Sequence, residues 1–136
     1  MRTHVQFRSD AFPAEAGEAE AVNPGRWGGT LAAFLRGELD RVGLKGGEVH
    51  AEDWGWLVPI ENEAFPLWIG CGNHEEHPDG FLCFIEPSKP TVRRGLFRKV
   101  DTTARVSEVA DALDKILASR SDIRDMRWWS DDEAVT

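Results

Sequence analysis

The sequence predicts a two-layer α+β domain in which a mainly antiparallel sheet carries two helices on one face. Three observations support this fold class. Two segments repeat apolar residues at helical spacing. Short apolar runs bounded by turn residues indicate strands, and three of these runs follow one another through short connections. Clustered strands of this kind pair antiparallel, so the expected order is strand, helix, three strands, helix, strand.

The first strand is expected over residues 4–9, where apolar and polar residues alternate weakly. The first helix is expected to begin at Asn23-Pro24, because asparagine caps a helix and proline fits its first position. Gly43 is expected to end it in a left-handed conformation. Its apolar residues at helical spacing are Trp27, Leu31, Phe34, Leu35, Leu39 and Val42.

Three more strands are expected over residues 54–58, 67–71 and 81–85, each a short apolar run. The second helix is expected after Asp101-Thr102-Thr103, and the last strand over residues 126–129. The apolar stripe of the second helix consists of Val106, Val109, Ala110, Leu113, Ile116 and Leu117.

The 136 residues are expected to form a single domain, 1–136, because a chain of this length buries about 70% of its unfolded surface around one core. Residues 13–21 are small and acidic, which is typical of a mobile loop. Residues 130–136 are expected to form a disordered acidic tail.

The formal net charge of −8 argues against a nucleic-acid-binding protein and against binding to an anionic membrane. The N-terminal residues lack the apolar core of a signal peptide, and no apolar run approaches membrane-spanning length. We therefore expect a cytoplasmic protein whose two cysteines, Cys71 and Cys83, are reduced.

Large apolar residues occupy both parities of the central strands, so both faces of the sheet need to be covered. Two helices can cover one face. Four candidates can cover the second: the irregular segment around Phe12, the Leu96-Phe97 region, a second copy of the chain, or a protein partner.

The chain has six tryptophans and no tyrosine. Trp128 and Trp129 are adjacent, so on a strand they point to opposite faces. Tryptophan is enriched among binding hot spots, and we expect the second face to bind a protein partner or to form a homodimer. The residues expected to supply this surface are Trp54, Trp56, Trp68, Trp128 and Trp129.

The segment GCGNHEEHPDG, residues 70–80, contains three metal-ligand types in Cys71, His74 and His77, with Glu75, Glu76 or Asp79 as a fourth. The spacing matches no standard zinc signature, and Pro78-Asp79-Gly80 alone is typical of a turn. We therefore favour a solvated hairpin loop and expect no cofactor. The alternative is a zinc site, and with it a metal-dependent or acid–base enzyme.

The segment from Lys89 to Lys99 holds five of the 16 cations and no acidic residue. Arg93, Arg94, Arg98 and Lys99 provide an alternative anion-binding site, because arginine binds phosphate and carboxylate through two parallel hydrogen bonds. The simpler interpretation is that these cations pair with the chain's own carboxylates or face solvent.

The sequence contains no G-x-S-x-G motif, no P-loop and no G-x-G-x-x-G motif, so it favours binding over catalysis. In general character it is similar to the bacterial immunity proteins that neutralise basic toxins, which are small, acidic, tryptophan-rich single domains. This resemblance covers no motif and assigns no residue. It implies an immunity-like or adaptor-like role.

Overall fold

The computed structural model describes residues 1–14, 27–74 and 76–130. The helices are α2 (Gly29–Arg41) and α3 (Thr103–Ala118). The strands are β1 (Arg2–Ser9), β2 (His50–Glu52), β3 (Gly55–Ile60), β4 (Leu67–Asn73), β5 (Gly80–Glu86), β6 (Thr91–Arg94), β7 (Arg98–Asp101) and β8 (Ile123–Ser130).

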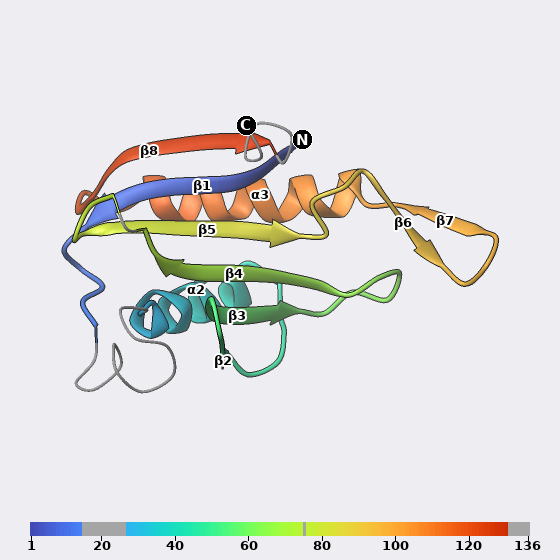
Figure 1. Cartoon of the computed structure of the whole chain (residues 1–136), viewed down its shortest axis with the longest axis horizontal. Coiled ribbons are helices and arrows are strands. Elements are labelled where there is room, and N and C mark those ends of the chain that lie inside the picture. Colours follow the sequence, from blue (N-terminus) through green and yellow to red (C-terminus); the bar gives the residue numbers. More distant parts are fainter. Residues whose placement is uncertain (15–26, 75, 131–136) are drawn as a thin grey trace.

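Six strands form one sheet in the order β2-β3-β4-β5-β1-β8, and β6 and β7 form a separate hairpin that projects from its end (Figure 1). Every paired strand in the sheet is antiparallel to its neighbour. The first strand lies between β5 and β8, so the first and last strands are paired in the sheet. The predicted α+β class and order of elements are confirmed.

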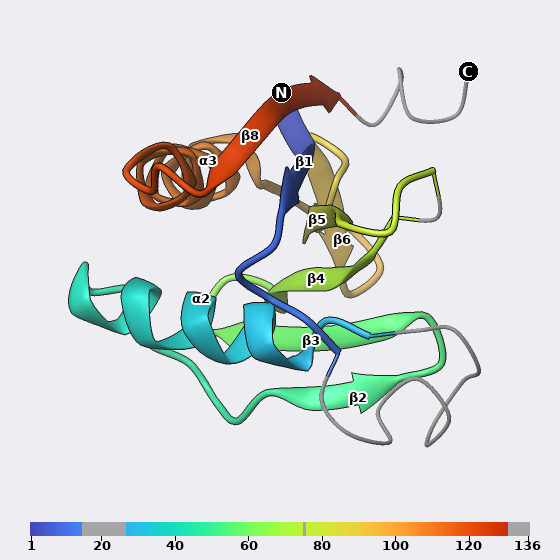
Figure 2. The ribbon, with the colours of Figure 1, turned by 90° about the vertical axis from the view of Figure 1, so that its left-hand side faces the viewer.

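Both helices lie on the same side of the sheet (Figure 2). Alternate residues of the strands point to this side and are buried with the apolar stripes of α2 and α3. Phe7 and Phe81 stack at its centre with their ring centroids 5.7 Å apart. Burial of each Leu, Ile or Phe side chain stabilises the fold by about 1.5–3 kcal/mol. This side is therefore the core.

The first helix begins later than the sequence predicts. Trp27 precedes it, and the backbone of Trp27 is hydrogen-bonded to the end of β4 through the backbone N–H and side chain of Asn73. The expected start at Asn23-Pro24 lies outside the described residues. Gly43 follows the helix with a φ of +88°, the left-handed conformation that the sequence predicts.

Three short strands were not expected from the sequence. The first, β2, has only three residues, and β6 and β7 carry four of the cations that suggested a solvated segment. The expected mobile loop and acidic tail fall largely on residues 15–26 and 131–136, which lie outside the described residues. Within the described part of the chain, no helix combines the length and the apolar character needed to cross a membrane.

Candidate functional site

We call the side of the sheet opposite the helices the outer face. The strand residues that alternate with the core residues point to this face. Val5 and Phe7 of β1 are buried in the core, whereas His4 and Gln6, which alternate with them, are half-buried on the outer face. The same alternation separates Cys83 and Ile85 from Phe84 on β5. Among the described residues, no helix lies over this face (Figure 2).

Aligned positions on the outer face form a row across the sheet. Trp129 of β8 pairs with His4 of β1, His4 pairs with Phe84 of β5, and Phe84 pairs with Gly70 of β4. Leu57 of β3 continues the row beyond Gly70. Side chains from strands far apart in the sequence therefore lie next to one another.

Five aromatic side chains on or beside this row are in contact, and we call them the aromatic face. His4 stacks on Trp129 and on Phe84, with ring centroids 5.8 and 5.9 Å apart. Trp54 contacts Phe84 at 5.2 Å and Trp68 at 5.6 Å, and Trp68 meets Phe84 edge-on at 5.7 Å. All of these separations fall in the range favoured for aromatic pairs.

Gly70 makes room for this cluster. A Cβ atom at Gly70 would lie 2.3 Å from Cζ of Phe84 and 2.8 Å from Cζ3 of Trp54, closer than real Cβ contacts. Trp54 is in the two-residue turn between β2 and β3, and its ring lies over Gly70 with 38% of the residue exposed. The turn and the glycine together bring Trp54 onto the outer face.

The five tryptophans expected at a binding surface divide between the two sides of the sheet. Trp54, Trp68 and Trp129 belong to the aromatic face. Trp56 and Trp128 pack against the core instead, and Nε1 of Trp128 donates a hydrogen bond to Asp114 of α3 at 2.8 Å. Phe84 and His4, which complete the aromatic face, were not singled out because neither is recognisable without the strand register.

Polar groups border the aromatic face. Glu86 lies at one end of β5 opposite Trp68, and Arg127 of β8 lies with its guanidinium 5.7 Å from the Trp129 ring centroid. Neither Glu86 nor Arg127 forms an ion pair with any described residue. Nε1 of Trp129 is buried and has no hydrogen-bond partner. This arrangement, an apolar centre with a polar rim, is typical of protein interfaces.

Two of the four candidates for covering the outer face do not cover it. Phe12 is buried on the helix side, in contact with Phe34 of α2 and with Phe81. Leu96 and Phe97 are 82% and 97% exposed at the tip of the β6–β7 hairpin. The remaining candidates are a second copy and a protein partner.

The segment GCGNHEEHPDG forms the end of β4, a loop and the start of β5. Cys71 points into the core, where its Sγ lies 3.8 Å from Sγ of Cys83 directly across the strand pair. The hydrogen bond with Cys83 is the main reason that the pKa of the Cys71 thiol is raised well above its ordinary value, and burial adds to it. The structure thus separates Cys71 from His74 and His77.

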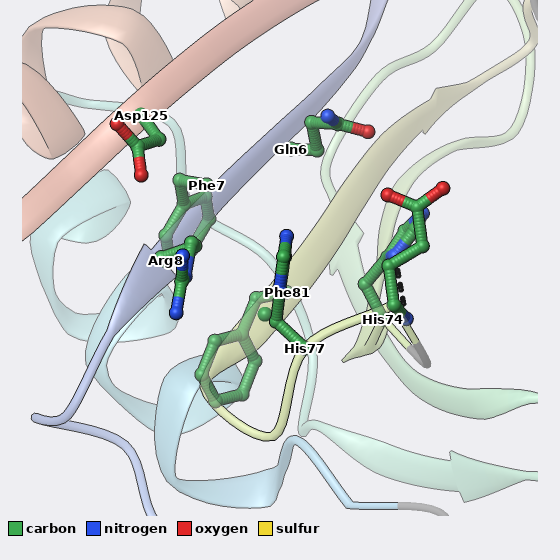
Figure 3. Close-up of a pocket in the computed structure, with 9 residues that line it drawn as sticks. Gln6, Phe7, Arg8, His74, His77, Phe81 and Asp125 are labelled. Atoms are coloured by element: carbon green, nitrogen blue, oxygen red, sulfur yellow. Dashed lines mark hydrogen bonds between the residues drawn. The ribbon is translucent and has the colours of Figure 1, made fainter.

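His74 and His77 line a pocket of about 250 Å³ between their loop and strands β1 and β8 (Figure 3). Gln6 and Arg8 of β1 and Asp125 of β8 line it as well. Within the described residues, which exclude residue 75, no three His, Cys, Asp or Glu side chains are grouped as metal ligands. The pocket offers hydrogen-bonding groups to a small polar ligand.

An ion-pair cluster closes the loop beside this pocket. Asp79 accepts a hydrogen bond from Arg8 at 2.8 Å and forms a second ion pair with Arg124 of β8. The hydrogen bond from Arg8 is the main reason that the pKa of Asp79 is lowered, and Arg124 adds to it. Because the Ser9 N–H also donates to the Asp79 backbone oxygen, one residue ties the loop to two strands.

The hairpin brings the four cations of the predicted anion-binding site together. Arg93 lies directly opposite Lys99, and Arg94 directly opposite Arg98. None of the four forms an ion pair with a described residue. The exposed pair Leu96-Phe97 between them is part of the same surface; the signal for it in the sequence is two large apolar residues inside a run of cations.

Comparison with protein-family models, curated proteins and solved structures finds no match for this chain.

Proposed function

We propose that this chain acts by binding another protein molecule, and that the aromatic face is its binding surface. The observation that carries the proposal is the set of five contacting rings on a sheet face that no described helix or strand covers. Contiguous apolar surface of this kind is uncommon on monomeric proteins and marks interaction sites. The two core thiols, which are not joined in a disulfide, are consistent with our expectation of a reducing, cytoplasmic location.

Aromatic residues suit this role for two physical reasons. Trp and Phe remove large areas from water when a partner covers them, yet lose little conformational freedom. The cluster holds its own rings in place, because Trp54, Trp68 and Phe84 each contact the other two. A surface that is already ordered costs less entropy on binding than one that orders at that moment.

The test compares two alanine variants for binding of an uncharged apolar dye and for self-association by sedimentation. Trp54→Ala removes the most exposed ring of the aromatic face, and we expect it to weaken both by about tenfold, the size of a typical hot-spot truncation. Val42→Ala is the matched control, because Val42 is 59% exposed just after α2 and is not part of the aromatic face. It should change neither.

The opposite pattern contradicts the proposal. If the unmodified protein binds no apolar dye and stays monomeric at the highest concentration tested, the aromatic face is only a self-contained cluster. An equal effect of Val42→Ala and Trp54→Ala would also show that the binding has no preference for this face.

A further inference from the structure

The tip of the β6–β7 hairpin is the most exposed apolar feature among the described residues. Leu96 and Phe97 are 82% and 97% exposed, whereas the other large apolar residues classed as exposed range from 37% to 59%. Gly95, with a φ of +78°, opens the three-residue turn that places them at the tip. The hairpin extends beyond the end of the sheet, so its tip reaches away from its own molecule (Figure 1).

The stem of the hairpin places like charges face to face. Arg93 pairs with Lys99 and Arg94 with Arg98, and like charges directly opposite one another destabilise a strand pair. Val92 and Val100 pack against the core. Arg94 and Arg98 lie on the same side of the hairpin as these valines and border a pocket with Glu63. Arg93 and Lys99 lie on the opposite side of the hairpin. Carboxylates from a second molecule would relieve this repulsion.

Resting on the proposed function, we propose that the partner of the aromatic face is the β6–β7 hairpin of a second copy of this chain. Leu96 and Phe97 of one molecule pack on Trp54, Trp68 and Phe84 of the other. Arg93 and Lys99 then reach the acidic residues beside that face, Glu86 on β5 and the Glu52-Asp53 pair next to Trp54.

Charge complementarity favours a second copy as the occupant. Residues 91–101 hold four of the 16 cations but only one of the 24 acidic residues, so the rest of the chain has 12 cations against 23 acids. The acidic remainder attracts the hairpin of another copy, whereas it repels an anionic membrane brought close to the same hairpin. When two molecules exchange hairpins reciprocally, the two contacts are equivalent and the assembly closes as a dimer.

Each contact needs one hairpin and one aromatic face, so a mixing experiment tests the inference. The hairpin variant is Phe97→Ser combined with Arg93→Glu, and the face variant is Trp54→Ala; all three side chains are exposed, which preserves the fold. Circular dichroism verifies folding, and Val42→Ala is the control. Sedimentation velocity with a fluorescent label on one variant reports whether the two bind each other.

The expected result is that each variant alone associates at least about tenfold more weakly than the unmodified protein. A mixture of the two should form a labelled dimer, because the hairpin of the face variant still fits the face of the hairpin variant. Val42→Ala should associate like the unmodified protein.

Three results would overturn the inference. Normal association of the hairpin variant, with loss only in the face variant, would leave the aromatic face as a binding surface and remove the hairpin as its occupant. A monomeric unmodified protein that still binds apolar dye would assign the face to a different protein. Binding to phosphatidylserine–phosphatidylcholine vesicles, lost with Phe97→Ser and without self-association, would assign the hairpin to a lipid surface.

Discussion

Gly70, which has no side chain, makes room for two large ones, Phe84 and Trp54. Replacing Gly70 with alanine should push Phe84 and Trp54 apart, because the added methyl would lie within 3 Å of both rings. We expect overpacking of this kind to destabilise the fold by about 1–3 kcal/mol and to expose Trp54 further. Chemical denaturation followed by tryptophan fluorescence measures both effects.

The matched control for that substitution is Gly37→Ala. Gly37 is exposed in the interior of α2, and nothing lies within 4 Å of the position of its Cβ. Alanine there should stabilise the protein by about 0.5–1 kcal/mol, because glycine lowers helix stability by that amount. A stabilising effect at both positions would contradict the packing of Trp54 and Phe84 over Gly70.

The two cysteines should be inert in the folded protein. The hydrogen bond with Cys83, together with burial, raises the pKa of the Cys71 thiol. The thiol therefore stays protonated through neutral pH, and only the thiolate reacts. We expect thiol reagents to modify Cys71 and Cys83 no faster than the protein unfolds, and both at once in denaturant. Fast labelling of the native protein at neutral pH would be inconsistent with this burial.

At the scale of single residues, the sequence predicted some placements and missed others. The adjacency of Trp128 and Trp129 was enough to place them on opposite sides of a strand. The expected strand over residues 54–58 included both Trp54 and Trp56, but Trp54 lies in a turn, where the alternation of a strand no longer applies. The stacking of His4 between Phe84 and Trp129 depends on long-range register, which no local pattern encodes.

At the scale of elements, Asp79 links the β4–β5 loop to β1 and β8, and this link should depend on pH. The lowered pKa means that the ionised carboxylate stabilises the folded state above its unfolded pKa, near 4, and that this contribution is lost as the pH falls through the folded pKa. Asp79→Asn should therefore be less stable than the unmodified protein at neutral pH.

The difference in the free energy of unfolding between the two proteins should shrink as the pH falls below 4 and vanish once Asp79 is protonated. Thermal unfolding between pH 2 and pH 7 measures it. Asp111→Asn is a suitable control, because Asp111 forms a single exposed ion pair with Arg2. A difference that grows toward acidic pH would contradict the role of the Arg8–Asp79 pair.

One substitution in the β6–β7 hairpin should stabilise the hairpin and at the same time weaken association with a second copy. Lys99→Glu replaces a like-charge pair with an opposite-charge pair across from Arg93, which should stabilise the strand pair by about 0.2–1 kcal/mol. We expect slower amide exchange in β6 and β7 of the isolated molecule and, at the same time, weaker association with a second copy. Stronger association of this variant would show that the positive charge has no role in docking.

Short and charged elements were the ones that sequence reasoning missed. The strands β2, β6 and β7 have three or four residues each, too few for a clear alternation, and cations dominate the hairpin. The later start of α2 has a different cause, because the Trp27 backbone is held by Asn73 of β4 rather than by the helix. Longer apolar runs in α3, β4 and β5 were predicted because burial alone determines them.

At the scale of the whole molecule, one property of the sequence already indicated the candidate site. Apolar residues on both parities of the central strands cannot all be buried by two helices on one side, so the need for a second cover followed from the pattern. Whether a given segment covers the outer face depends on the path of the chain, which the pattern does not predict. Phe12 turns toward the helices, and Leu96 and Phe97 turn away from the sheet.

The proposal that the hairpin of each copy docks on the aromatic face of the other is tested most directly by hydrogen–deuterium exchange of the unmodified protein at low and high concentration. We predict that raising the concentration slows amide exchange in two separate segments: the hairpin, residues 91–101, and the turn that carries Trp54. Identical exchange at both concentrations, or slowing confined to the exposed edge of β8, would contradict the account.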